Sequence, residues 1–189
     1  MFLTPRELLD IVVMTLGVGF IFMDLFSSGL NLHAKPVPVP RPKKFDWHAF
    51  GFACLVTAPA VIFHELAHKF TAIGFGADAT FHAAYLFLAL GIALKLIRSP
   101  IIFFVPGYVA IPGTLGAYPT ALTAFAGPAL NGLLYLLAIF VIENVRMNPR
   151  ARMFWLLTRR INGFLFIFNL LPIPGFDGFT VFSSLFHLF

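Results

Sequence analysis

Long apolar runs divide this chain into segments that are typical of helices in a membrane. The runs cover residues 11–30, 49–63, 83–97 and 120–142, with one charged residue each in the first and the third. The run at residues 120–142 has 23 positions and no charge, and a helix needs about 20 such residues to cross a bilayer. The pattern therefore predicts a polytopic helical membrane protein.

The composition supports a membrane protein of one domain. Of the 189 residues, 59% are hydrophobic and 11% are charged, whereas soluble domains carry about 25% charged residues. Such a chain has too little polar surface for an ordinary soluble domain, and too much apolar surface for a disordered one. We expect residues 1–189 to form a single transmembrane domain.

The net charge of +5 does not indicate a nucleic-acid partner. Nine of the 13 basic residues fall in two windows, residues 35–44 and 146–160. Basic clusters between apolar runs are typical of loops at a membrane surface, so we expect no nucleic acid and assign both windows to loops. The one cysteine, Cys54, excludes an intrachain disulfide and a cysteine-built metal site.

An additional helix and a loop are predicted before the core. Residues 1–32 are predicted to hold an additional transmembrane helix. Asp24 in it is either a functional carboxylate or, as we favour, a residue near the helix end or packed uncharged in the bundle. Residues 33–47 form a basic loop whose four alternating prolines favour extended polyproline structure. The core then covers about residues 48–178.

The middle of the chain is less regular. The run at residues 83–97 is short for a span and predicts a re-entrant helix. Residues 101–111 are rich in Ile, Phe and Val and are cut by Pro106-Gly107, which predicts a short strand pair. We therefore expect an all-α bundle of about four to six transmembrane or re-entrant helices with a short membrane-embedded β-hairpin.

The last helix of the core is predicted at residues 154–171. Pro172 and Pro174 cannot continue it, and residues 175–178 are expected to form a turn. The apolar stretch that follows has about a dozen residues, too few to span a bilayer. It is either a half-helix on the bundle or the start of a further helix.

A His-Glu-x-x-His pattern lies inside the second apolar segment. His64 and His68 are four residues apart, so both imidazoles share one helix face and can converge on one zinc ion. Glu65 is offset and can act on water without becoming a ligand. The alternative is a hydrogen-bonded His/Glu network or proton relay. We favour zinc, because burying these groups in an apolar helix is costly unless they bind something.

Catalytic zinc usually takes three protein ligands, and spacing alone does not decide the third. The candidates are Asp78, His82, Glu143, His187 and Asp177. Asp177 follows the prolines that end a buried helix, where a broken helix can aim a side chain inward. From spacing alone, the choice stays open.

Three motifs occur in a fixed order along the chain, each on its own predicted segment. They are HELAH at residues 64–68, GPALN at residues 127–131 and NLLPIPGFDG at residues 169–178. This combination resembles the site-2 protease family of intramembrane zinc metalloproteases, over about residues 50–178. A segment at residues 77–96 is longer than the simplest family pattern requires.

The resemblance implies roles for particular residues. His64, His68 and Asp177 would bind one zinc ion per chain, with Glu65 as the general base. Asn169 would be a catalytic residue that binds the substrate carbonyl or oxyanion.

The resemblance also implies a structural role for the GPALN motif. Gly127 and Pro128 would pack their helix tightly against the core. Asn131 would hydrogen-bond within the core rather than bind metal.

The function that follows is an intramembrane zinc endopeptidase, a multi-pass integral membrane protein that cleaves substrates in or near their transmembrane segments. Its partners would be the lipid bilayer and a transmembrane-protein substrate. The alternatives are an ion-binding transporter or channel, or a metal-binding membrane protein without turnover. Orientation stays open, because the resemblance places the site nearer the cytosol whereas the positive-inside rule places both basic windows there.

Overall fold

The computed structural model describes residues 3–24, 45–99, 105–113 and 115–187, which form a mostly helical molecule with one small sheet. The predicted proline-rich segment at residues 35–44 lies outside the described residues. The elements in chain order are α1 (Pro5–Phe22), α3 (Trp47–Gly74), β1 (Thr80–Ala83), α4 (Tyr85–Leu96), β2 (Gly107–Ala110), α5 (Ala117–Asn144), α6 (Pro149–Asn169) and α7 (Asp177–Phe186).

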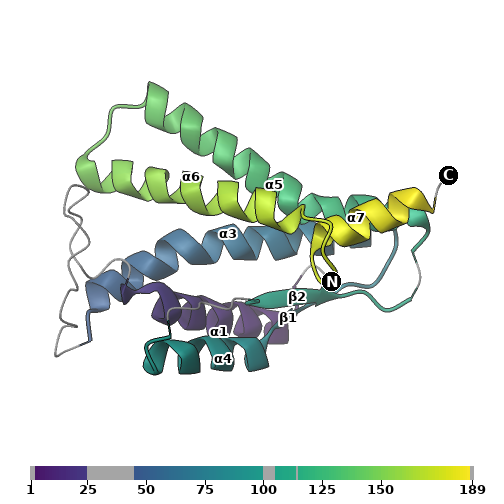
Figure 1. The fold of residues 1–189 in the computed structure, drawn as a ribbon, viewed down its shortest axis with the longest axis horizontal. Helices are drawn as coiled ribbons and strands as arrows, with labels where there is room; N and C mark the ends of the chain where they lie inside the picture. The colour runs from purple at the N-terminus through teal and green to yellow at the C-terminus, as the bar shows by residue number, and fades with distance from the viewer. Residues whose placement is uncertain (1–2, 25–44, 100–104, 114, 188–189) are drawn as a thin grey trace.

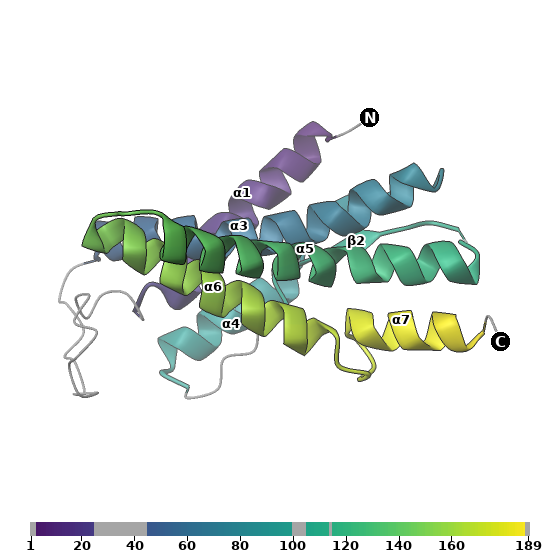
Figure 2. The same ribbon diagram turned by 90° about the horizontal axis from the view of Figure 1, so that it is seen from above.

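Helix α3 runs through the middle of the molecule. Figure 1 shows α5 and α6 on one side of it, and the sheet with α1 and α4 on the other. Helix α3 contacts α1, α5 and α6, and α7 packs along the N-terminal part of α5 (Figure 2). Side chains of α3 can therefore meet residues from both halves of the chain.

The two long apolar helices lie close to where the sequence predicts them. Asp46 caps α3 by accepting a hydrogen bond from the Ala49 N–H at 2.9 Å, as expected for a residue that satisfies a free helix donor. Among the described helices, α3 and α5, each of 28 residues, are the two that are long and apolar enough to cross a membrane. The further spans of the predicted bundle stay predictions.

The second basic window is not the loop that its charge suggests. Helix α6 begins at Pro149, so most of residues 146–160 are helical. Asn148 caps the helix by accepting from the Ala151 N–H at 2.8 Å, and Pro149 stands at the first helical position, which suits its fixed φ. The prediction that this helix begins at residue 154 was wrong, because the charges obscured the capping signal.

Helix α1 also begins earlier than the apolar run. Thr4 and Glu7 form a capping box, with Glu7 N–H donating to the Thr4 hydroxyl and Thr4 N–H to the Glu7 carboxylate. This reciprocal cap satisfies two free donors at the helix start. The part of the predicted N-terminal span beyond residue 24 lies outside the described residues.

A strand pair does form between residues 77 and 112, where the sequence predicts one with a re-entrant helix, and residues 101–104 of the predicted hairpin lie outside the described residues. Strand β2 pairs antiparallel with β1, which precedes α4, so α4 lies within the connection between them. Pro106 and Gly107, expected at a turn, instead lead into β2. Pairing across an intervening helix leaves no local turn signal, so the sequence does not show which segment pairs with β2.

A compact apolar core fills the space between α1, α3, the sheet and α4. Its largest ring belongs to Phe81 of β1, which is 1% exposed. The other buried members are Met14, Val18, Ile21, Val61, Ala83 and Leu88. This core fixes the sheet against the helices, because burial of each large side chain contributes about 1.5–3 kcal/mol.

An ion pair is buried next to this core. Lys69 of α3 donates to the carboxylate of Glu7 on α1. Lys69 is 1% exposed and Glu7 is 0% exposed. Both charges are thus removed from solvent, and each depends on the other for compensation.

Removing only the cation should destabilise the fold strongly. We expect Lys69→Met to lower the free energy of unfolding by about 3–5 kcal/mol, because it leaves an uncompensated buried carboxylate. The double variant Glu7→Leu/Lys69→Met should recover most of this loss, since neither charge remains. Unfolding in detergent micelles, followed by circular dichroism, measures both; equal stability of Lys69→Met and the parent would contradict the expectation.

Candidate metal centre

Helix α3 carries the two imidazoles on one face. His64 Nε2 lies 3.1 Å from His68 Nε2, as the i,i+4 spacing on a helix allows. Their exposures are 7% and 8%, so neither ring is freely hydrated. The arrangement concentrates two nitrogen ligands at one buried point.

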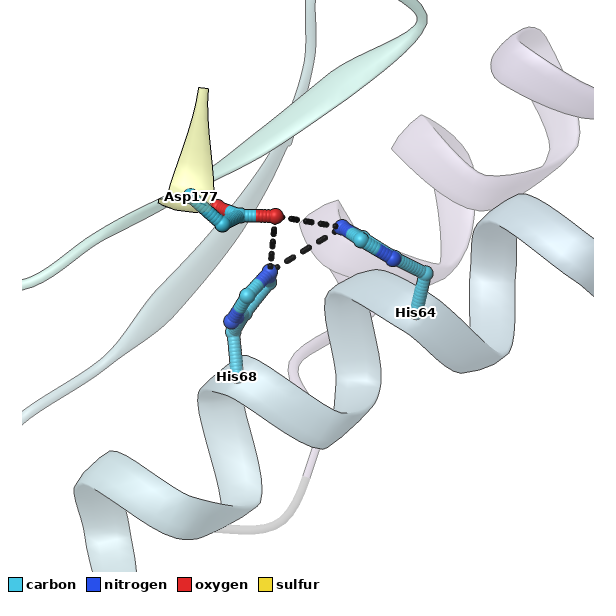
Figure 3. Close-up of side chains that lie close together, drawn as sticks. All are labelled: His64, His68 and Asp177. Atoms are coloured by element: carbon cyan, nitrogen blue, oxygen red, sulfur yellow. Dashed lines mark hydrogen bonds and ion pairs between the residues drawn. The ribbon is translucent and has the colours of Figure 1, made fainter. Parts of the chain in front are cut away.

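Asp177 brings a carboxylate to the same point from the far end of the chain. Its Oδ2 lies 3.1 Å from His64 Nε2 and 3.4 Å from His68 Nε2, and Figure 3 shows this oxygen facing both rings. Asp177 is the first residue of α7 rather than part of the predicted turn. Among the described residues, these three form the only cluster able to hold a metal ion.

The chain reaches this position through a tight connection after α6. Gly175 has φ +95°, a left-handed conformation that favours glycine. A Cβ on Gly178 would lie 2.7 Å from the carbonyl oxygen of Leu171. Both glycines therefore allow α7 to begin directly against the end of α6, which places Asp177 over α3.

Hydrogen bonds determine which nitrogen of each ring is free. Asn131 uses both amide protons, one on the Ala60 carbonyl at 3.0 Å and one on Asn162 Oδ1 at 2.9 Å. Its Oδ1, 2.6 Å from His64 Nδ1, must therefore accept, so His64 Nδ1 carries the proton.

The second ring is fixed in the same way. His68 Nδ1 lies 2.7 Å from the main-chain carbonyl of Thr123, which can only accept a hydrogen bond. Both Nε2 atoms are then left with lone pairs that point toward each other and toward Asp177. Partners of this kind orient metal-binding histidines in proteins.

The donor set fits a tetrahedral zinc ion. Ligand atoms at about 2.0–2.1 Å from zinc lie about 3.3–3.4 Å from one another in a tetrahedron. The three separations here are 3.1, 3.1 and 3.4 Å. Three lone-pair donors held this close repel one another, and a cation between them removes that repulsion.

Gly127 of α5 keeps the space beside the two rings open. A Cβ at this position would lie 2.6 Å from His68 Cε1 and 2.8 Å from His64 Cε1, closer than real atoms approach. Glycine therefore lets α5 approach the imidazoles, while the adjacent Pro128 is fully buried. The GPALN motif thus supplies this gap and, through Asn131, the hydrogen bond to His64.

Filling this gap should disturb the metal centre. We expect Gly127→Ala to weaken zinc binding at least about tenfold, because the methyl group displaces one or both ligating rings. Gly51→Ala is the matched control, since a Cβ there meets no atom within 4 Å. Competition with a zinc-binding dye measures both variants; unchanged affinity in Gly127→Ala would contradict the packing.

The two residues expected to act on substrate occupy different places. Glu65 lies beside the rings on α3 and is 8% exposed, but it is not part of the three-residue cluster. Asn169 is half-buried at the last position of α6. Within the described part of the chain, no hydrogen bond joins Asn169 to the cluster.

The other candidate ligands lie elsewhere. Asp78, Glu143 and His187 are exposed. His82 of β1 faces Asp10, with Nδ1 at 3.7 Å from Oδ2.

Asp24, the carboxylate in the first apolar run, lies outside the centre as well. Its Oδ1 is 3.4 Å from Lys95 Nζ of α4. The contact gives Asp24 a basic partner on α4, and its role stays a prediction.

Sequence reasoning missed two groups that help to orient the histidines, one through Asn131 and one by direct contact. Asn162 of α6 is 1% exposed and supports Asn131, and an amide in an apolar helix is a signal that could have been noticed. His68 is held by the main-chain carbonyl of Thr123. Every residue has such a carbonyl, so the sequence cannot identify this partner.

The fold and the centre together define a class: an apolar helical protein that holds a His₂Asp metal site. The chain is 32% identical over 184 residues to a protein of Methanocaldococcus jannaschii named "Putative zinc metalloprotease". The alignment covers 93% of this chain and 82% of the relative. The chain belongs to the family of this relative. No family model matches the chain, and no solved structure matches it.

Proposed function

We propose that the chain is an intramembrane zinc endopeptidase of the site-2 type, which hydrolyses peptide bonds in or near transmembrane segments of membrane proteins. The observation that carries the proposal is the convergence of three ligand atoms on an apolar, bilayer-length helix. The family of the Methanocaldococcus jannaschii relative supports the metalloprotease part.

The position of the centre along α3 supports cleavage inside the membrane. The 28-residue helix is about 42 Å long, and His64 lies about 15 Å from its C-terminal end. A helix that crosses the bilayer, with a hydrocarbon core about 30 Å thick, would therefore hold the imidazoles below the surface. Exposed side chains on α5, among them Leu133, Leu136 and Phe140, suit contact with lipid.

The chain's own residues supply the proton transfers. Zinc, when held by this centre, contributes Lewis-acid activation for hydrolysis of an amide. Glu65 removes a proton from the attacking water and delivers it to the leaving amine. Asn169 donates its amide N–H to the developing oxyanion after substrate enters beside the end of α6.

The outer edge of β2 is the proposed receptor for the substrate backbone. A helical substrate hides its carbonyls in its own hydrogen bonds, so it must unwind before cleavage. Strand β2 lies against α3 while β1 lies against α1, and an extended peptide can add to the free edge of a sheet. Val109 would present its N–H and C=O there. Replacing it with proline removes that N–H and should reduce cleavage.

Reconstitution tests the proposal directly. Purified chain in lipid nanodiscs is mixed with a synthetic transmembrane peptide of about 20 apolar residues that contains a central helix-breaking Gly-Pro pair. We expect one zinc per chain and cleavage within the apolar segment, abolished by a chelator and restored by zinc. Cleavage that persists without metal, or none with zinc fully bound, would refute the proposed function.

A further inference from the structure

The buried Glu7–Lys69 pair lies outside the metal centre but joins three elements. Lys69 follows His68 directly on α3, Glu7 belongs to α1, and the Glu7 carboxylate also reaches β1. Its Oε1 accepts a hydrogen bond from the Phe81 N–H at 2.8 Å. One carboxylate oxygen therefore binds both the helix that carries the imidazoles and the strand beside it.

The pairing register shows which edge this hydrogen bond occupies. Phe81 stands opposite Val109, and Ala83 stands opposite Gly107. The Ala84 N–H donates to the Pro106 carbonyl at 3.0 Å, so Ala84 and Pro106 form a hydrogen-bonded pair. In an antiparallel ladder, every second pair from this one is hydrogen-bonded as well. Phe81 and Val109 therefore face each other without exchanging hydrogen bonds. The N–H of Phe81 points to the outer edge of β1, and the N–H of Val109 points to the outer edge of β2.

The outer edges of β1 and β2 differ in whether their outward N–H groups have a hydrogen-bond acceptor. On the β1 edge, Glu7 accepts the Phe81 N–H, and α1 covers the strand. On the β2 edge, no hydrogen bond to the Val109 main chain occurs within the described residues. An unsatisfied edge is a template for another strand, whereas an edge occupied by a buried carboxylate is not.

We propose that Glu7 and Lys69 are positioning residues that lock the sheet to the metal helix and close the β1 edge, so that an extended peptide adds to β2 alone. The inference rests on the proposed function, whose substrate-binding strand it specifies. Lys69 holds Glu7 to α3 one residue after a metal ligand, and Glu7 holds Phe81. The pair thereby sets the distance from the β2 edge to the centre.

The strand register predicts which main-chain amide the peptide protects, and this can be tested without substituting Glu7 or Lys69. The Glu65→Gln chain in nanodiscs is examined by hydrogen exchange at single amides, with and without the Gly-Pro transmembrane peptide. The Phe81 amide should be protected before peptide is added, because it is bonded to buried Glu7. The Val109 amide should become protected only with peptide.

Two double variants isolate the acceptor. Glu7→Leu/Lys69→Met removes both charges and leaves the Phe81 N–H without a partner. Glu7→Gln/Lys69→Met removes the same charges but keeps a side-chain oxygen for that N–H. Lys95→Met is a further control, because it removes a different cation, which donates to the Phe20 carbonyl of α1 and lies 3.4 Å from Asp24 Oδ1.

We expect the Glu7→Leu/Lys69→Met chain to retain zinc but to bind peptide about five- to tenfold more weakly, as loss of one positioning hydrogen bond implies. With Glu65 intact, the same change should appear in KM rather than in kcat. Lys95→Met should bind peptide like the parent, and Glu7→Gln/Lys69→Met should fall between the parent and Glu7→Leu/Lys69→Met, because it keeps the acceptor for the Phe81 N–H but loses the link to α3. A purely structural role would instead lower zinc content or kcat together with peptide affinity.

Several results would overturn the inference. Equal peptide affinity in the two double variants would do so, as would peptide protection at Phe81 instead of Val109, or absence of peptide binding. If Glu7→Leu/Lys69→Met does not fold, the exchange experiment on the Glu65→Gln chain decides. Failure of the proposed function looks different: peptide binds at Val109, but wild-type chain with full zinc never cleaves it.

Discussion

Glu65→Gln is expected to abolish peptide cleavage while zinc stays bound. The carboxylate lies beside the imidazoles without joining the three-residue cluster, so its replacement leaves every proposed ligand in place. Gln has nearly the same size but cannot take a proton from water. General acid–base catalysis contributes about 10²–10⁴-fold, and we expect a loss of that order in kcat.

The measurement pairs zinc content with single-turnover cleavage of the transmembrane peptide. Retained zinc with lost cleavage separates an enzyme from an ion-binding transporter or a metal-binding protein without turnover, because neither of those needs a non-ligand carboxylate beside its first histidine. Cleavage at the wild-type rate in Glu65→Gln would rule out the proposed role of this residue.

Asp177→Asn is expected to lose both zinc and activity. Its Oδ2 lies 3.1 and 3.4 Å from the two Nε2 atoms, and the amide keeps the size while removing the charge that balances a cation. We expect zinc affinity to fall at least about 100-fold, beyond the range typical of residues that only support a ligand. His64→Ala and His68→Ala should also remove the metal, since two protein ligands rarely retain catalytic zinc.

Asp78→Asn is the matched control. It makes the same chemical change at an exposed carboxylate between α3 and β1. We expect it to bind zinc and cleave peptide normally, as measured by metal analysis and turnover alongside Asp177→Asn. Loss of zinc in Asp78→Asn, with retention in Asp177→Asn, would show that α7 is misassigned as the source of the third ligand.

The long elements of the fold were predictable because their signals are local. Uninterrupted apolar runs predicted both α5 and the first part of α3. The strand pair was harder, because β1 has four residues and its partner lies beyond α4. Helix α6 begins before its predicted start because Asn148 caps it, and that cap lies in a basic window whose charge is typical of a loop.

The centre could be predicted in part. The four-residue spacing of His64 and His68 is enough to place both rings together on a helix. Asp177 could not be placed from spacing, because its approach depends on how α7 packs against α5, and only the family resemblance selected it. The Glu7–Lys69 pair joins residues far apart in the chain, so no local sequence pattern predicts it.

The separation of the ligands along the chain has a consequence for biosynthesis. Translation proceeds from the N terminus, so His64 and His68 are synthesised well before Asp177. Until α7 docks, the nascent chain offers two metal ligands, too few to retain catalytic zinc. In the proposed protease, hydrolytic competence would therefore appear only when the last described helix is in place, so the unfinished polypeptide would be harmless to its neighbours at the translocon.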